Sequence, residues 1–256
     1  MPFSAQDNKI NTRGNDFVYI QDNQLWLGKA DNSGAKPVVK KIVDQTAGYV
    51  LSNSRSKIAY VDDGYLKVIT ILSGEEIMLR KLMPDDYSPS GRAASPAYLD
   101  FIGNIAWSSD DSKLAFVGGN DAQADIYTIS VDGRNLKRLT DDRINEISLV
   151  WSPYDQKIAF QTTTGLGSGA GYDSDIVVMN SDGGNYSKIV IEGKLPGDYH
   201  ASPAENLRWI NNDEISFLAW TVGGYQGIWK ANVNTKQITH LVNKLGESDP
   251  AWSGKN

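Results

Sequence analysis

The chain has 256 residues, a formal net charge of −6 and no cysteine. Its length predicts one large domain or two small ones, and the lack of cysteine excludes disulfides, thiolate nucleophiles and thiolate metal sites. An acidic balance without a run of Lys or Arg argues against a nucleic-acid partner, since duplex binding needs a basic surface.

Nothing in the sequence predicts a membrane span or a secretion signal. No window approaches 18 consecutive apolar residues, the length that a spanning helix needs. The first ten residues, MPFSAQDNKI, lack a charged segment followed by an apolar one. The protein is therefore expected either to be cytoplasmic or to be a mature or trimmed form.

A short motif recurs along the chain and is the main guide to its fold. It reads AWSSDDSKLAF at 106–116 and VWSPYDQKIAF at 150–160. Related copies are VLSNSRSKIAY at 50–60, the shorter RWINNDEISF at 208–217, AWSGKN at 251–256 and a faint INTRGNDFVY at 10–19. A second block follows most copies, as in DIYTISVDGRNLKRLT at 125–140 and DIVVMNSDGGNYSKIV at 175–190. Its tight turn between two short runs indicates a hairpin.

Each repeat therefore predicts four short antiparallel strands. Four strands in about 40–45 residues are typical of one blade of a β-propeller. We expect an all-β, five-bladed propeller of four-stranded blades in a single domain, residues 1–256. Because an open ring would expose strand edges, the segment 251–253 is expected to complete the first blade and close the ring; a six-bladed or truncated ring is the alternative. The blades are expected at 14–46 with 249–254, 47–83, 105–141, 149–192 and 207–243.

The motifs WSPYDQKIAF with DIVVMNSDGGN, and WSSDDSKLAF with DIYTISVDGRNLKRLT, resemble the WD40-like (PD40) repeat of TolB-type β-propellers. The resemblance covers nearly the whole chain and implies a propeller fold. TolB-type rings usually have six blades, and TolB itself carries a separate N-terminal domain, so the resemblance supports the fold better than TolB's own role. The family's place in the bacterial envelope implies a periplasmic or extracellular location.

Six of the seven tryptophans fall on repeat positions. These tryptophans are expected to pack between blades. Four of them stand in first strands and two in third strands. They are Trp107, Trp151, Trp209 and Trp252, and Trp26 and Trp229.

The turns of such a repeat divide between two ends of each blade. The turns between first and second strands and between third and fourth strands share one end, named here the short-turn end. The connections between second and third strands, and those between blades, share the opposite, long-loop end. Long loops on a rigid scaffold often bind ligands, so a site is expected at the long-loop end, near the axial mouth; the alternative is that the loops only plug the channel. The irregular segments at this end are 84–104, 117–124, 161–174 and 193–206.

The candidate ligand-binding residues are aromatic and charged side chains at the long-loop end. Trp220 stands out because it has no repeat partner and ends the second strand of the last blade. Aromatic side chains in such places stack on sugars or anchor peptides, and the alternative for each is local packing. The candidates are Arg92, Tyr98, Asp100, Tyr172, Asp173, Tyr199, His200, Trp220 and Tyr225.

Catalytic and metal chemistry have little support. His200 is the natural candidate for a group that titrates near neutral pH, but no G-x-S-x-G elbow accompanies it, and no catalytic residue is assigned. Asp173 and Asp175 offer oxygen ligands for calcium. Asp175, however, aligns with Asp125 ahead of a third strand, which favours a turn residue, so no cofactor or metal is expected. Some sugar lyases on TolB-type propellers use histidines and a metal at the mouth of the ring, and this sequence lacks that histidine set.

We therefore expect a monomeric, non-catalytic binding module that presents its loop-rich end to a protein, a peptide or a glycan. The alternative is a carbohydrate-active hydrolase or lyase with carboxylates such as Asp100, Glu205 or Asp249 in the axial mouth. A third interpretation is a fragment of a larger ring or of a peptidase.

Overall fold

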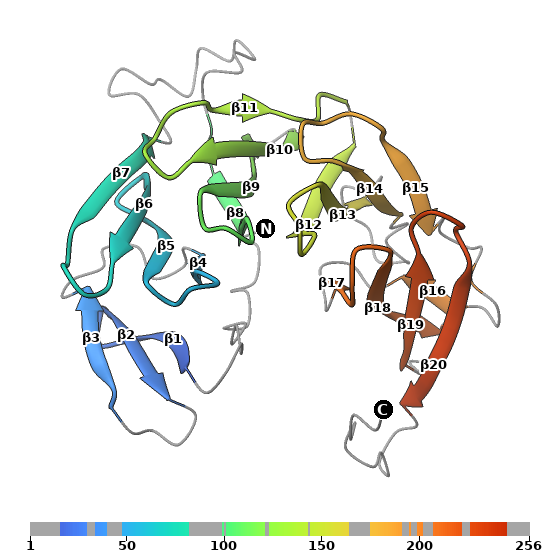
Figure 1. Ribbon diagram of the computed structural model, residues 1–256, viewed down its shortest axis with the longest axis horizontal. Coiled ribbons are helices and arrows are strands. Elements are labelled where there is room, and N and C mark those ends of the chain that lie inside the picture. Colours follow the sequence, from blue (N-terminus) through green and yellow to red (C-terminus); the bar gives the residue numbers. More distant parts are fainter. Residues whose placement is uncertain are drawn as a thin grey trace. The chain divides into compact units, whose positions relative to one another are not determined.

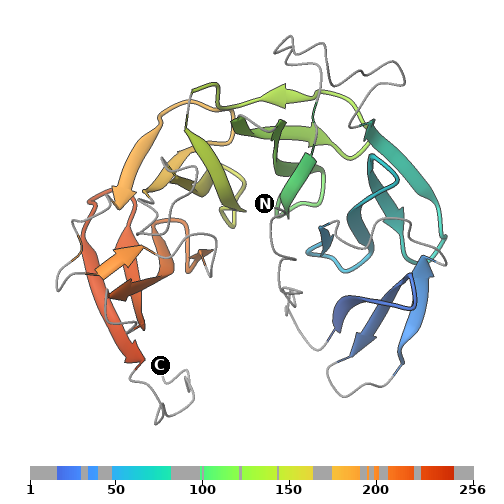
Figure 2. The same cartoon turned by 180° about the vertical axis from the view of Figure 1, so that it is seen from behind.

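The computed structural model describes residues 16–29, 34–39, 48–81, 99, 101–120, 123–142, 144–163, 175–190, 195, 199–201, 207–221 and 226–244. These residues form twenty strands in five antiparallel sheets, with no helix among them (Figure 1; Figure 2 gives the view from behind). The described part contains no helix that is long and apolar enough to cross a membrane. The expected fold class, an all-β chain of five antiparallel blades, is confirmed.

The chain divides into two compact units, Met1–Asp141 and Asp142–Asn256, named here the first and second units. The first unit holds three sheets, β1 to β3, β4 to β7 and β8 to β11, each built from strands that follow one another in the chain. The segment expected in the first-strand position of the first sheet, 251–253, lies outside the described residues, so ring closure stays a prediction. The strands are β1 (Asp16–Gln21), β2 (Gln24–Lys29), β3 (Lys36–Val39), β4 (Tyr49–Leu51), β5 (Lys57–Asp62), β6 (Tyr65–Thr70), β7 (Glu76–Lys81), β8 (Phe101–Trp107), β9 (Lys113–Asn120), β10 (Gln123–Ser130) and β11 (Lys137–Arg138).

The second unit holds the fourth and fifth sheets. In the fifth sheet the first-strand position is shared by two short strands, β16 and β17, which both pair with β18. β16 falls inside the segment 193–206 that the sequence predicts as a loop, and pairing with the far end of β18 makes it a strand. The strands are β12 (Asn145–Trp151), β13 (Lys157–Thr163), β14 (Ile176–Asn180), β15 (Ser187–Val190), β16 (Tyr199–Ala201), β17 (Arg208–Trp209), β18 (Glu214–Thr221), β19 (Gln226–Asn232) and β20 (Ile238–Lys244).

The first strands of two sheets begin earlier than the repeat motif indicates. β8 begins at Phe101 and β12 at Asn145, ahead of the expected blade starts at 105 and 149. Each has a register irregularity upstream of its tryptophan, between Gly103 and Ile105 in β8 and between Glu146 and Ser148 in β12. A bulge breaks the alternation of side chains, and this explains why the pattern is visible only near the tryptophan.

Neighbouring sheets within a unit share an apolar core. In the second, third and fourth sheets the second strand is buried on both faces, so its residues are buried in succession, whereas buried and partly buried residues alternate along β18 of the fifth sheet. Ile158, Ala159 and Phe160 of β13 are fully buried in this way. One cluster joins the second and third sheets, and another joins the fourth and fifth.

Tryptophans of the first strands also connect neighbouring sheets. Trp107 Nε1 donates a hydrogen bond to the Val50 carbonyl at 3.1 Å, and Trp209 Nε1 donates to the Val150 carbonyl at 3.2 Å. Val50 and Val150 hold the same repeat position in the preceding sheet. A buried indole N–H needs an acceptor, and the repeat provides it for Trp107 and Trp209, whereas Trp151 Nε1 is buried without a hydrogen bond among the described residues.

In the second to fifth sheets, the two short turns of a sheet are bonded to each other. Backbone N–H groups at the start of the turn between third and fourth strands donate to the last carbonyl of the turn between first and second strands. The two short turns of a sheet therefore lie at one end, as the repeat predicts. The bonds are Ile71 N to Ser56 O (2.9 Å), Val131 N to Ser112 O (3.0 Å), Ser181 N to Gln156 O (2.9 Å) and Val233 N to Asp213 O (2.8 Å).

In the first unit, the short turns of two neighbouring sheets are held together by one carboxylate. Asp111, in the turn after β8, accepts the backbone N–H of Asn53 (2.8 Å), the side-chain amide of Asn53 (3.1 Å) and the backbone N–H of Ser54 (2.9 Å). The Asn53 amide also donates to the Ser108 carbonyl at 2.7 Å. Burial tends to raise the pKa of Asp111, but the hydrogen bonds from Ser54 and Asn53 outweigh it and hold the pKa below its ordinary value.

Candidate functional site

Of the residues expected to bind a ligand, the structure describes the strand positions of Tyr199, His200 and Trp220. The other expected residues lie outside the described ranges, and their role stays a prediction. They are Arg92, Tyr98, Asp100, Tyr172, Asp173 and Tyr225.

Strand pairing brings two of the described candidates together. β16 lies antiparallel to the last residues of β18, with Tyr199 opposite Thr221 and His200 opposite Trp220. β18 starts at the short turn of its sheet, so its last residues lie at the long-loop end. The sequence expects His200 in a loop, whereas the structure places it on a sheet, in register with Trp220.

Asp175, one of the two carboxylates that the sequence offers to calcium, has a cationic partner. Its carboxylate accepts a hydrogen bond from Lys188 Nζ. At the matching position of the third sheet, Asp125 pairs with Arg138 at 2.6 Å. Both ion pairs join the start of a third strand to a fourth strand. Within the described ranges, no group of three or more His, Asp or Glu side chains is arranged to hold a metal ion.

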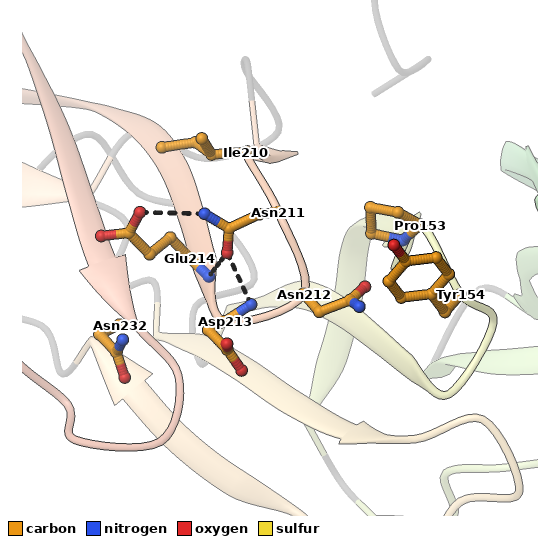
Figure 3. A pocket seen from close by; sticks show the side chains of 8 residues that line it. All are labelled: Pro153, Tyr154, Ile210, Asn211, Asn212, Asp213, Glu214 and Asn232. Carbon is orange, nitrogen blue, oxygen red and sulfur yellow. Dashed lines mark hydrogen bonds between the residues drawn. The ribbon is translucent and has the colours of Figure 1, made fainter.

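A pocket of about 650 Å³ lies at the short-turn end of the second unit (Figure 3). It is open to solvent and lies between the turn joining β12 to β13 and the turn joining β17 to β18, with one residue from the end of β19. The lining residues are Pro153, Tyr154, Ile210, Asn211, Asn212, Asp213, Glu214 and Asn232.

The pocket exposes apolar side chains that its sheets do not cover. Tyr154 is 72% exposed and Ile210 is 49% exposed. Figure 3 shows Tyr154 and Pro153 on one side and Asn212 extending toward them from the other. In the described part of the chain, neither the Tyr154 hydroxyl nor the Asn212 side chain makes a hydrogen bond. Both are therefore available to a ligand.

Hydrogen bonds fix the opposite wall. Asn211 Oδ1 accepts the backbone N–H groups of Asp213 (2.8 Å) and Glu214 (3.0 Å), and Asn211 Nδ2 donates to Glu214 Oε2 (3.1 Å). Lys230 Nζ donates to Glu214 Oε1 at 2.7 Å. The bond from Lys230, together with that from Asn211, lowers the pKa of Glu214, so this carboxylate is ionised at neutral pH.

Sequence reasoning missed this pocket because it expected a site at the long-loop end, whereas the turn in VWSPYDQKIAF lies at the short-turn end. A signal was present in the two residues that follow the recurring serine of the turn. Pro153 and Tyr154 stand where the second sheet has Asn53 and Ser54. A large aromatic side chain is unusual in a turn of otherwise small polar residues.

The chain was compared with known proteins. No protein-family model matches it, and no curated protein matches it by sequence. Solved structures do match. An oligogalacturonate lyase from Vibrio parahaemolyticus has a TM-score of 0.66 at 14% identity, over 90% of this chain and 62% of that one. An oligogalacturonate lyase in complex with manganese has a TM-score of 0.65 at 15% identity, over 86% of this chain and 59% of that one.

A third structure is named as a TolB protein. The putative TolB from Agrobacterium tumefaciens has a TM-score of 0.61 at 15% identity, over 90% of this chain and 77% of that one. This chain thus spans less than two thirds of each lyase. At such low identities the likeness concerns the fold and not the activity. The resemblance that the repeats indicate is confirmed at that level: this chain has the fold of the TolB-type β-propellers.

Proposed function

We propose that the chain is a non-catalytic binding module that holds a polypeptide at the long-loop end of its fifth sheet. The pairing of β16 with the end of β18 carries this proposal. It places Tyr199, His200 and Trp220 on neighbouring strands, where a rigid sheet positions residues more accurately than a loop does.

The residue types at these positions suit a peptide ligand. Tryptophan and tyrosine are the most frequent anchors of protein interfaces. In the described part of the chain, β16 pairs with β18 alone. An extended peptide is able to add to the other edge of such a strand through main-chain hydrogen bonds.

The test is a selection of random 12-residue peptides displayed on phage against the whole chain, followed by calorimetry with the selected peptides. We expect Trp220→Ala to weaken binding by at least about tenfold, as for an interface anchor, and His200→Ala to weaken it less. Tyr154→Ala, at the short-turn end, is the matched control and should leave peptide affinity unchanged. Thermal unfolding of each variant checks that the fold is retained. Peptides that bind Trp220→Ala as tightly as the unmodified chain would refute the proposal.

A carbohydrate-active enzyme is the alternative, and the likeness to two oligogalacturonate lyases favours testing it. Incubation with oligogalacturonate, followed by ultraviolet absorbance of the double bond that elimination creates, distinguishes the two functions. We expect no turnover. Turnover abolished by His200→Ala would replace the proposal with a lyase. The periplasmic or extracellular location implied by the resemblance is part of the proposal and is checked by cell fractionation.

A further inference from the structure

We propose that the pocket at the short-turn end of the second unit is a second binding site and that its ligand is an uncharged saccharide. This site is independent of the polypeptide site proposed above. It uses the turns after β12 and β17 and the end of β19.

One wall of the pocket is apolar. The ring of Tyr154 is 72% exposed beside Pro153, although a turn residue of this sheet needs no aromatic ring for its fold. An aromatic ring that is open on one face stacks on the C–H face of a sugar ring. Ile210, 49% exposed, extends the apolar surface on the other side of the pocket.

Short polar side chains surround the ring of Tyr154. A sugar hydroxyl both donates and accepts, and so does a carboxamide. Asn212 extends toward Tyr154 without an intramolecular hydrogen bond in the described part of the chain. Asp213 accepts from Asn234 Nδ2 at 2.8 Å through one oxygen, which leaves its second oxygen as an acceptor. Asn232 adds a further carboxamide, whose Oδ1 accepts two backbone N–H groups.

Hydrogen bonds already order the polar wall of the pocket. Asn211 holds the turn through its bonds to Asp213 and Glu214. Lys157 Nζ lies 3.3 Å from Asn234 Oδ1, and Asn234 in turn holds Asp213. Ligand binding therefore spends little free energy on ordering these side chains, which is a general source of affinity.

Charge decides between uncharged and anionic saccharides. The charged residues that line the pocket are Asp213 and Glu214, and no Lys or Arg is among the described lining residues. Two cations lie beside the pocket: Lys230 is paired with Glu214, and Lys157 Nζ lies 3.3 Å from Asn234 Oδ1. A carboxylated sugar would meet like charge without compensation. The ligand class is therefore neutral, unlike the oligogalacturonate after which the two lyases are named.

The experiment uses calorimetry on the whole chain with neutral tetrasaccharides of glucose, mannose, galactose and N-acetylglucosamine, and with tetragalacturonate as the anionic probe. We expect at least one neutral tetrasaccharide to bind with a Kd below about 10 mM and tetragalacturonate to bind at least about tenfold more weakly. Tyr154→Ala and Asn212→Ala should each weaken the neutral probe by about tenfold or more.

Two controls separate this site from the rest of the molecule. Gln156→Ala changes an exposed residue of the same turn that does not line the pocket, and it should leave saccharide affinity unchanged. Trp220→Ala should also leave it unchanged. The proposal is overturned if no neutral tetrasaccharide binds, if tetragalacturonate binds at least as tightly, or if Tyr154→Ala retains full affinity.

Discussion

Each unit contains a junction where two sheets meet at their short-turn ends, and the two junctions differ. In the first unit, Asp111 binds the turn that carries Asn53 and Ser54. In the second unit, the matching turn carries Pro153 and Tyr154, and a pocket of about 650 Å³ lies beside it. Both junctions keep an indole-to-carbonyl bond and a shared apolar cluster. A change of a few turn residues is therefore enough to turn a closed junction into a binding surface on the same scaffold.

The second junction is open because its described residues lack the hydrogen-bond donors of Asn53 and the acceptor carboxylate of Asp111. Proline has no N–H, so Pro153 cannot make the bond that Asn53 makes. The turn after β17 is one residue shorter than the turn after β8, and its described residues include no carboxylate bonded across the junction as Asp111 is. The bonds of Asn53 and Ser54 to Asp111 are named here the clasp. The described part of the second junction lacks both the N–H at the position of Asn53 and the carboxylate, so its turn residues remain exposed.

The largest expected effect concerns the element that both junctions share. Trp107→Ala removes a side chain that is only 6% exposed, together with its hydrogen bond to Val50. We expect the free energy of unfolding to fall by about 3–5 kcal/mol, measured by urea unfolding. Trp209→Ala should cost less, because Trp209 is only half-buried. A greater loss at Trp209 would contradict the idea that the first junction is the tighter one.

Asn53→Pro imports the residue of the open junction into the closed one. It removes the backbone N–H and the side-chain amide that bind Asp111 and Ser108. We expect a loss of about 2–3 kcal/mol in urea unfolding, as for hydrogen bonds to a charged group. Proline occupies the matching position 153, so the backbone of this turn accommodates it. Asn53→Ala is the control: it keeps the N–H and should cost about 1 kcal/mol, and an equal cost for both variants would show that the N–H bond is unimportant.

Asp111→Asn tests the charge of the clasp. Asparagine tolerates the left-handed backbone at this position, φ 56°, and the loss at pH 7 should be about 1–2 kcal/mol. The pKa of Asp111 is lowered by folding, so the contribution of its carboxylate is complete above the unfolded value of about 4 and is lost as pH falls below it. The gap between the two proteins, followed by thermal unfolding from pH 7 to pH 2.5, should therefore narrow below about pH 4. Asp132→Asn, an exposed turn residue of the same unit, is the control and should be near neutral; a gap that stays constant in acid would exclude an ionised clasp.

The smallest effect is expected for the reverse exchange, Pro153→Asn. It restores an N–H and an amide to the open junction, but no carboxylate of the described turn after β17 is bonded across the junction as Asp111 is. We expect the free energy of unfolding to change by no more than about 0.5 kcal/mol, as for most exposed substitutions. Stabilisation by more than about 1 kcal/mol in urea unfolding would mean that a second acceptor takes the place of Asp111.

Much of the fold followed from the sequence because each blade repeats the same local chemistry. The tryptophan, the tight turn and the β-branched run sit at fixed offsets, so five sheets and their short turns were predicted from spacing. The strand at Tyr199–Ala201 was not predicted, because the nearby Gly197 and Pro203 are residue types typical of loops and the pairing with β18 is a tertiary interaction.

The candidate sites were less accessible to sequence reasoning. The adjacency of His200 and Trp220 depends on a register that only the folded sheet sets. The pocket forms between residues 153–154 and 210–214, which belong to different repeats. An alignment of repeats shows the residues that each repeat shares with the next, but it does not show a pocket formed by residues of two different repeats.

The bonds between the two short turns of a sheet bear on how such a protein changes in evolution. Ser181 N and Gln156 O, or Val131 N and Ser112 O, come from a single repeat of about 40 residues. A tandem duplication copies donor and acceptor together, so a new blade arrives with its turn end complete. Loss of a repeat likewise removes both partners at once. The number of repeats can therefore change while each blade keeps its own local fold. Selection then acts on the residues at the junctions between neighbouring blades.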